Sequence, residues 1–225
     1  MASVAEARRG LVDLTRLAEA DLRRIWLRLN NLPADEVRDA LMALLPVLAG
    51  TYGDAAGALG ADWYDDMRAE AEVRGTFRAE PAPLPGTARF EALARWGVDP
   101  LFRPNPDPAA ALVLLSGGMQ RTIADAHRMT VVESSLRDPA AEGWRRIGQG
   151  DNCGFCNMLI GRGAVYKEAT VTFKSHDHCN CIAGPAFDPG RTVPTIARDM
   201  SQRRLSDETK RKNNARAYEW IKANQ

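Results

Sequence analysis

Apolar side chains recur at helical spacing near the start of the chain. Between residues 4 and 29, leucine and isoleucine return every three to five residues, and Trp26 joins the same face. Because an α-helix turns once in about 3.6 residues, this spacing predicts an amphipathic helix that buries one side. The segment from Asn30 to Pro33 should end it. The positions of the stripe are Leu11, Leu14, Leu17, Leu22, Ile25 and Leu29.

A second long helical pattern covers residues 35 to 73. Its apolar face is typical of a helix that packs into a core between other helices. Pro46 and a run of glycines interrupt the pattern, and together they predict a kink or a break near its middle. The apolar positions are Leu41, Leu44, Leu45, Leu48, Tyr52, Ala56, Leu59, Trp63 and Met67, and the glycines are at 50, 53, 57 and 60.

Shorter elements follow up to residue 139. His127, in the last helix of this part, is expected to be a surface or interface residue. The predicted elements are a proline-rich loop at 79–86, a helix at 87–96, a loop around Pro100, Pro104 and Pro108, and a helix at 109–136 with a weak point at Gly117–Gly118 and an end at Asp138–Pro139.

The pattern then changes to short stretches rich in β-branched and aromatic residues, which indicate strands. The fold class predicted is α+β, with a helical domain at 1–140, a small α+β domain at 141–190 and a basic helical tail at 191–225. The expected elements of the middle part are strands at 144–147, 164–166, 170–173 and 179–183, a helical turn at 156–160, and a close of the last strand by Gly184–Pro185.

Composition narrows the class of protein. The chain has 225 residues, 45% of them hydrophobic, and a formal net charge of +1. That balance gives no overall attraction to nucleic acid or anionic membrane. Residues 1 to 9 lack the apolar run of a signal peptide, and no apolar stretch approaches the roughly 20 residues of a membrane span. We therefore expect a soluble protein made in a reducing cytoplasm, with no membrane partner.

The tail differs from the rest in charge. Between residues 191 and 225 it carries nine Lys or Arg and four acids, a local charge of +5. Such a segment fits an arm that contacts nucleic acid or another subunit, and it fits equally a solvated helix packed on the body. The candidate contact residues are Arg203, Arg204, Lys210, Arg211 and Lys212.

Two short clusters hold all four cysteines of the chain and two of its three histidines. The first is a C-x2-C pair, Cys153 and Cys156, and the second spans residues 176 to 181. Zinc takes four thiolate or imidazole ligands in a tetrahedron, and C-x2-C turns bring two sulfurs to one point. The candidate ligands are Cys153, Cys156, His176, Cys179 and Cys181, with His178 as a spare. The pattern leaves open which of Cys179, Cys181 and His178 completes the site with Cys153, Cys156 and His176.

A zinc site is the favoured interpretation, and two alternatives stay open: two disulfides, or four reduced core cysteines. Disulfides belong to oxidising compartments, and nothing in the chain indicates export. A cysteine-rich site with at least four ligands needs no water, and thiolates weaken the metal as a Lewis acid. Both properties favour a structural zinc that holds a small sheet over a catalytic one.

Motifs for the common catalytic sites are missing. The zinc deaminase pattern fails because no His-x-Glu precedes the C-x2-C. H-E-x2-H, G-x4-G-K-[ST] and G-x-S-x-G do not occur either, and a serine-protease triad has little support.

The cysteine clusters resemble those of the phage Mu protein F-like (MuF) minor head proteins, in the version found in tailed phages of actinobacteria. The resemblance is carried by Cys153-Gly-Phe-Cys156 and His176-Asp-His-Cys179-Asn-Cys181, with the surrounding residues 154–166, 173–176 and 179–185. The helical part, at 52–56 and 61–65, is similar to the same proteins. The resemblance extends to about residue 188 and leaves out the basic tail.

This resemblance implies a non-enzymatic minor capsid protein of head morphogenesis, found in the virion after synthesis in the host cytoplasm. The partners it implies are the portal, the major capsid protein, and packaged DNA if the tail reaches it. Two other functions remain open: a zinc-containing nucleic-acid-binding protein that uses the tail, and an enzyme, either a head-maturation protease or a zinc hydrolase.

Overall fold

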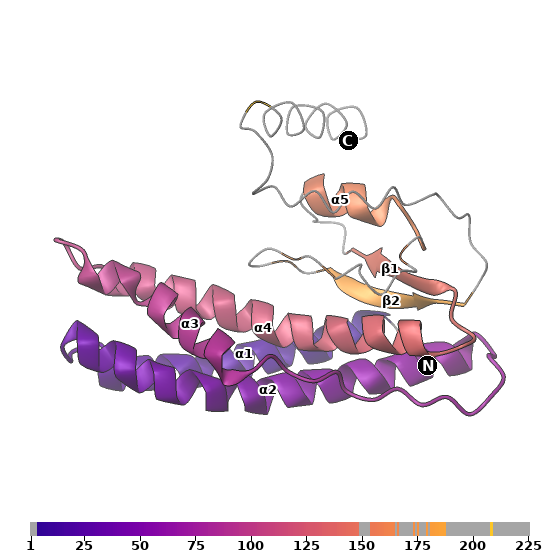
Figure 1. Cartoon of the computed structure of the whole chain (residues 1–225), viewed down its shortest axis with the longest axis horizontal. Helices are drawn as coiled ribbons and strands as arrows, with labels where there is room; N and C mark the ends of the chain where they lie inside the picture. The colour runs from indigo at the N-terminus through magenta and orange to yellow at the C-terminus, as the bar shows by residue number, and fades with distance from the viewer. Residues whose placement is uncertain are drawn as a thin grey trace.

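A computed structural model describes residues 4–148, 154–164, 166, 173, 175, 179, 181–187 and 208. Within these residues the chain is mostly helical, with one small two-stranded sheet (Figure 1). This agrees with the helical and α+β parts that the sequence predicts, while the predicted tail lies outside the described residues. The elements are α1 (Val4–Leu29), α2 (Ala34–Glu70), α3 (Thr87–Gly97), the 3-10 helix η1 (Asp99–Phe102), α4 (Pro108–Arg137), β1 (Gly143–Ile147), α5 (Gly154–Ile160) and β2 (Ile182–Ala186).

Three long helices, α1, α2 and α4, pack along one another, and α3 lies against α2 and α4 (Figure 1). In α1, a stripe at helical spacing faces the core, and Trp26 belongs to it as predicted. Leu17 does not, because it is half exposed while its neighbour Ala18 is fully buried. A small side chain at that position lets the neighbouring helix come closer than a leucine would. The buried residues of α1 are Ala7, Leu11, Ala18, Leu22 and Trp26.

The helix α2 is continuous over 37 residues, so the break predicted at its middle is wrong. Pro46 lacks a backbone donor, but packing of the fully buried residues beside it, such as Leu45 and Ala49, holds the helix. The glycines serve close packing. A Cβ added to Gly60 would lie 2.8 Å from the carbonyl oxygen of His127 in α4, so α2 and α4 meet nearly backbone to backbone there.

The length and apolar composition of α2 also reach those of a membrane span, contrary to the expectation that no apolar stretch is long enough to span one. Its many alanines and glycines raise the mean hydropathy without a long run of large apolar side chains. Its buried residues pack against α1, α3 and α4, as those of a core helix do.

The connection after α2 is tied down by a buried ion pair. Arg68 Nε lies 2.9 Å from Asp138 Oδ2, at the end of α4, and Tyr64 donates a hydrogen bond to the same oxygen at 3.1 Å. The other guanidinium nitrogens of Arg68 donate to the carbonyls of Val73, Arg74 and Gly75. One buried cation therefore joins α2, the following turn and the predicted end of α4.

The helix α4 runs unbroken through Gly117–Gly118 from the N-cap residue Asp107, whose side chain accepts a hydrogen bond from the Ala110 N–H. The weak point predicted at these glycines does not interrupt the helix. Gly118 lies against Leu93 of α3, where an added Cβ would come within 2.2 Å of a methyl group. As in α2, the glycine permits a close helix contact.

The strands β1 and β2 pair antiparallel, and β2 packs on α4. The last strand was predicted at 179–183 with Gly184–Pro185 as its end, but β2 begins at Ile182 and contains both residues. Pro185 faces Trp144, whose backbone N–H and C=O bond to Tyr166 on the other side. Since both groups of one residue point to the same neighbour in an antiparallel ladder, Pro185 faces a position that needs no donor.

Gly184 is required by a close approach of side chains. A Cβ there would lie 2.4 Å from the Ile147 Cδ1 and 3.5 Å from the Trp63 ring. Apolar residues of the sheet and of α5 join the same hydrophobic cluster as the long helices. The domain boundaries at 140 and 190 stay predictions. The strand predicted at 164–166 is represented by the bridge of Tyr166 to Trp144, and of that predicted at 170–173 only Phe173 is among the described residues.

Candidate metal centre

Three cysteine thiols meet in the space between α5 and the start of β2. Cys156, Cys179 and Cys181 are all buried, and their sulfur atoms lie within 4.8 Å of one another. The Sγ atoms of Cys156 and Cys179 are 3.7 Å apart. Cys156 comes from the first turn of α5, and the other two come from the chain just before β2. The fold thus brings residues about 25 positions apart to one point.

Aromatic rings pack on β1 next to the three cysteines. The ring of Trp144 in β1 stacks on Tyr166, with centroids 4.3 Å apart, and on Phe173, with centroids 5.6 Å apart. Tyr166 and Phe173 both come from the chain between the two cysteine clusters. Their ring packing holds these two residues against β1.

The sulfur separation fits a shared metal ion better than a disulfide. Cys156, Cys179 and Cys181 are not in disulfides, and the 3.7 Å between the sulfurs of Cys156 and Cys179 far exceeds the bond length of about 2.05 Å in a disulfide. In a tetrahedral zinc site with Zn–S bonds of about 2.3 Å, neighbouring sulfurs are about 3.8 Å apart. The three thiols could therefore bind a metal ion, and soft sulfur ligands suit zinc, copper(I) or iron–sulfur chemistry.

Proton sharing within the cluster makes one thiol a ready ligand. The pKa of Cys179 is lowered from 9.0 to about 4 because its thiolate accepts a hydrogen bond from the Cys181 thiol, with help from the charge of Arg128 and from Cys156. The hydrogen bond to Cys179, together with burial, raises the pKa of Cys181. The Cys179–Cys181 pair therefore releases its first proton more readily than an isolated thiol would.

Two buried arginines lie beside the three cysteines. In α4, Arg128 donates from Nε to the carbonyl oxygen of Cys181 at 2.8 Å and from Nη2 to the carbonyl oxygen of Cys179. In β1, Arg146 lies with Nη1 4.0 Å from the Cys179 sulfur. Both guanidinium groups lie over the ring of Phe173, at 4.9 Å for Arg128 and 3.7 Å for Arg146. The thiol cluster therefore has positive charge beside it from both α4 and β1.

The other sequence-predicted ligands, Cys153, His176 and the spare His178, lie outside the described residues. The same holds for the tail residues Arg203, Arg204, Lys210, Arg211 and Lys212. Their roles stay predictions.

Sequence reasoning missed the arginines and misplaced the histidine beside them. His127 is fully buried against Trp63 of α2, with ring centroids 5.8 Å apart, so its expected place at a surface or interface is wrong. The signal was the stretch from residue 123 to 132, where apolar residues fall on every side of the helix. A charged residue such as Arg128 inside so apolar a stretch indicates a buried partner.

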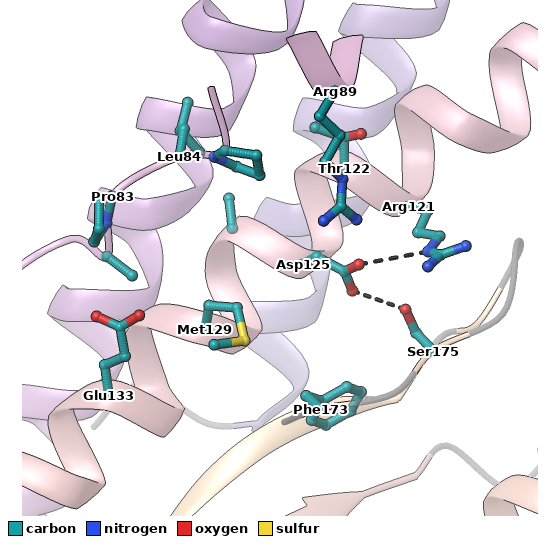
Figure 2. Close-up of a pocket in the computed structure, with 13 residues that line it drawn as sticks. Pro83, Leu84, Arg89, Arg121, Thr122, Asp125, Met129, Glu133, Phe173 and Ser175 are labelled. Atoms are coloured by element: carbon teal, nitrogen blue, oxygen red, sulfur yellow. Dashed lines mark hydrogen bonds and ion pairs between the residues drawn. The ribbon is translucent and has the colours of Figure 1, made fainter. Parts of the chain in front are cut away.

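A pocket of about 610 Å³ opens beside the centre, between the loop at 82–85 and α4 (Figure 2). Asp125 lies on its wall and is held by Ser175, whose hydroxyl donates at 2.8 Å, and by Arg121 at 3.6 Å. Arg128 reaches the same carboxylate from the protein side at 2.8 Å. Asp125 therefore joins the cysteine-bearing segment to α4.

The fold and the site define a mostly helical protein with a buried cluster of thiols that could take a metal ion. Residues 1–204 match the model of the family described as VG15 protein, and the chain belongs to this family, which is a viral family of phages. No curated protein matches the chain. No solved structure matches it either.

Proposed function

We propose that this chain is a non-enzymatic minor capsid protein of a phage head, of the Mu protein F-like kind, with one structural zinc ion. Two observations support the proposal. The family is a phage family, which suggests a virion or host-cell origin. The observation that carries the structural role is the burial of three convergent thiols in the small sheet region.

The chemistry of the ligand set supports zinc as the metal. Cys156, Cys179 and Cys181 would supply three ligands, and Cys153 or His176 would complete the tetrahedron. When bound, zinc supplies a rigid cross-link between α5 and β2. Buried, sulfur-rich sites of this kind lack the open position that a catalytic zinc keeps for water.

The expected partners follow from the phage role. We propose contacts with the portal or the major capsid protein through the helices, and with packaged DNA through the basic tail at 191–225. The net charge of +1 on the whole chain, against +5 on the tail, makes the tail the preferred contact for DNA.

Metal content is the first test. Mass spectrometry of the purified protein should find about one zinc per chain in the wild type and much less in Cys156→Ser. Ser116→Ala, at a half-buried position of α4 away from the three thiols, serves as the control and should leave the zinc content unchanged. Less than half a zinc per wild-type chain would refute the structural zinc.

Location is the second test. In purified heads of a phage that encodes this chain, quantitative mass spectrometry should find it at far fewer copies than the major capsid protein. Cross-linking should join it to the portal or to the capsid shell. Absence from washed heads would refute the virion role.

Deletion of 191–225 should weaken DNA binding and reduce its salt dependence, and unchanged binding would remove DNA from the partners.

A further inference from the structure

Arg128 is a buried cation whose partners lie on the cysteine-bearing segment. Its side chain is 1% exposed in the middle of α4. A guanidinium removed from water is strongly unfavourable unless it is paired and hydrogen-bonded. Arg128 meets this need with the carboxylate of Asp125 and with the carbonyl oxygens of Cys179 and Cys181.

These contacts control where two of the thiols lie. A guanidinium is planar and its N–H groups form a rigid fork. Because one fork holds the carbonyl oxygens of both Cys179 and Cys181, it sets the distance and direction of the two residues relative to α4. A lysine could donate to one carbonyl at a time and would leave the other free to move.

Arg146 places a positive charge next to the thiols. Three thiolates around a divalent ion leave a net negative charge, and a buried negative charge needs a nearby cation. Arg146 is 4% exposed and lies 4.0 Å from the Cys179 sulfur through its Nη1. It is thus placed to offset the thiolate charge from β1.

We propose that Arg128 and Arg146 are positioning residues of the metal centre. Arg128 holds the backbone of the two cysteines on α4, and Arg146 offsets the charge of the thiolates, so that metal binding and docking of the cysteine-bearing segment on α4 are coupled. This inference rests on the proposed metal-binding function. It adds residues from the helical body to a centre whose ligands all come from the C-terminal part.

Cobalt(II) titration in competition with a chelator tests the proposal. The bound ion reports its geometry through its visible bands and its sulfur ligands through the near-ultraviolet thiolate-to-cobalt bands. Outer residues that orient ligands typically change metal affinity about 10- to 100-fold. We expect a loss of that size, with weaker or shifted bands, in Arg128→Met and Arg146→Met, and a smaller loss in Arg128→Lys. The helical circular dichroism should stay that of the wild type.

Arg137→Met is the matched control. Arg137 lies on the same helix but is half exposed, and it pairs with the exposed Glu80, 3.4 Å away. The cobalt affinity of the Arg137→Met protein should stay within about twofold of the wild type.

The possible outcomes distinguish failure of this inference from failure of the proposed metal binding. Wild-type affinity and bands in both methionine variants would overturn the inference and leave the metal site standing. If Arg128→Met fails to fold, Arg128→Lys and Arg146→Met decide in the same way. A wild-type chain that takes up neither zinc nor cobalt would defeat the proposed site and the inference together.

Discussion

Lowering the pH from 7 to 5 is expected to destabilise the folded chain through His127. The side chain is fully buried, and neither ring nitrogen has a hydrogen-bond partner in the described part of the chain. Burial, together with the neighbouring charge of Arg128, lowers the pKa of His127 from 6.5 to about 4. In the interval between these values, the unfolded chain binds a proton that the folded chain does not.

The direction and size of the effect follow from linkage. Because the unfolded state binds more protons, the free energy of unfolding rises with pH between about 4 and 6.5 and is lost as the pH falls through that window. The free energy of unfolding that this pKa difference contributes at pH 7 is about 3 kcal/mol, and all of it is lost when the pH lies below both pKa values. At pH 5 the loss is about 2 kcal/mol. A loss of about 2 kcal/mol is a large share of the stability of a typical domain.

Urea unfolding followed by far-ultraviolet circular dichroism at pH 7, 6 and 5 measures the loss. Acid would also protonate the thiols and release a metal ion bound to them, so the useful quantity is the difference between the wild type and His127→Phe, measured with and without chelator. His127→Leu repeats the comparison with a smaller side chain, so that overpacking against Trp63 does not decide the result. Equal losses of free energy in the wild type and in both variants would refute the reasoning.

Three further predictions concern packing, the buried ion pair and the metal. Gly60→Ala should destabilise by about 1–3 kcal/mol in urea unfolding, because its Cβ meets a carbonyl oxygen at 2.8 Å. Gly50→Ala, with nothing within 4 Å, should be neutral or stabilising, and equal effects would contradict the close crossing. Asp138→Asn should cost about 3 kcal/mol in the same assay, because it leaves a buried guanidinium short of its carboxylate, whereas the exposed Glu80→Gln should change little. Chelation should speed alkylation of the cysteines at least tenfold by mass spectrometry, and equal rates with and without chelator would argue against a bound metal.

The long helices were largely predictable because their signals are local. The stripe in α1 and the caps of α4 at Asp107 and Asp138 depend on residues close together in the chain. The break in α2 was predicted wrongly because Pro46 and the glycines act locally against a helix, and the packing that overrules them comes from other helices. The start of β2 was missed because Gly184–Pro185 resembles a strand end until its partner strand is known.

The metal centre was predictable in part. The grouping of cysteines within 29 residues indicated a metal site, and the fold brings Cys156, Cys179 and Cys181 together. Cys153 and His176 remain predicted ligands. Arg128 could not be assigned a partner, since it lies about 50 residues before the carbonyls that it holds.

The sequence by itself determined the helices, the existence of a small strand-forming region and the kind of ligand atoms available to a metal. These depend on side-chain period, capping residues and thiol chemistry, which neighbours in the chain decide. Only the tertiary structure decided that α2 stays whole, that His127 is buried and neutral, and that Arg128 and Arg146 surround the thiols. Burial and charge compensation depend on which distant segments meet, and local spacing carries little information on those meetings.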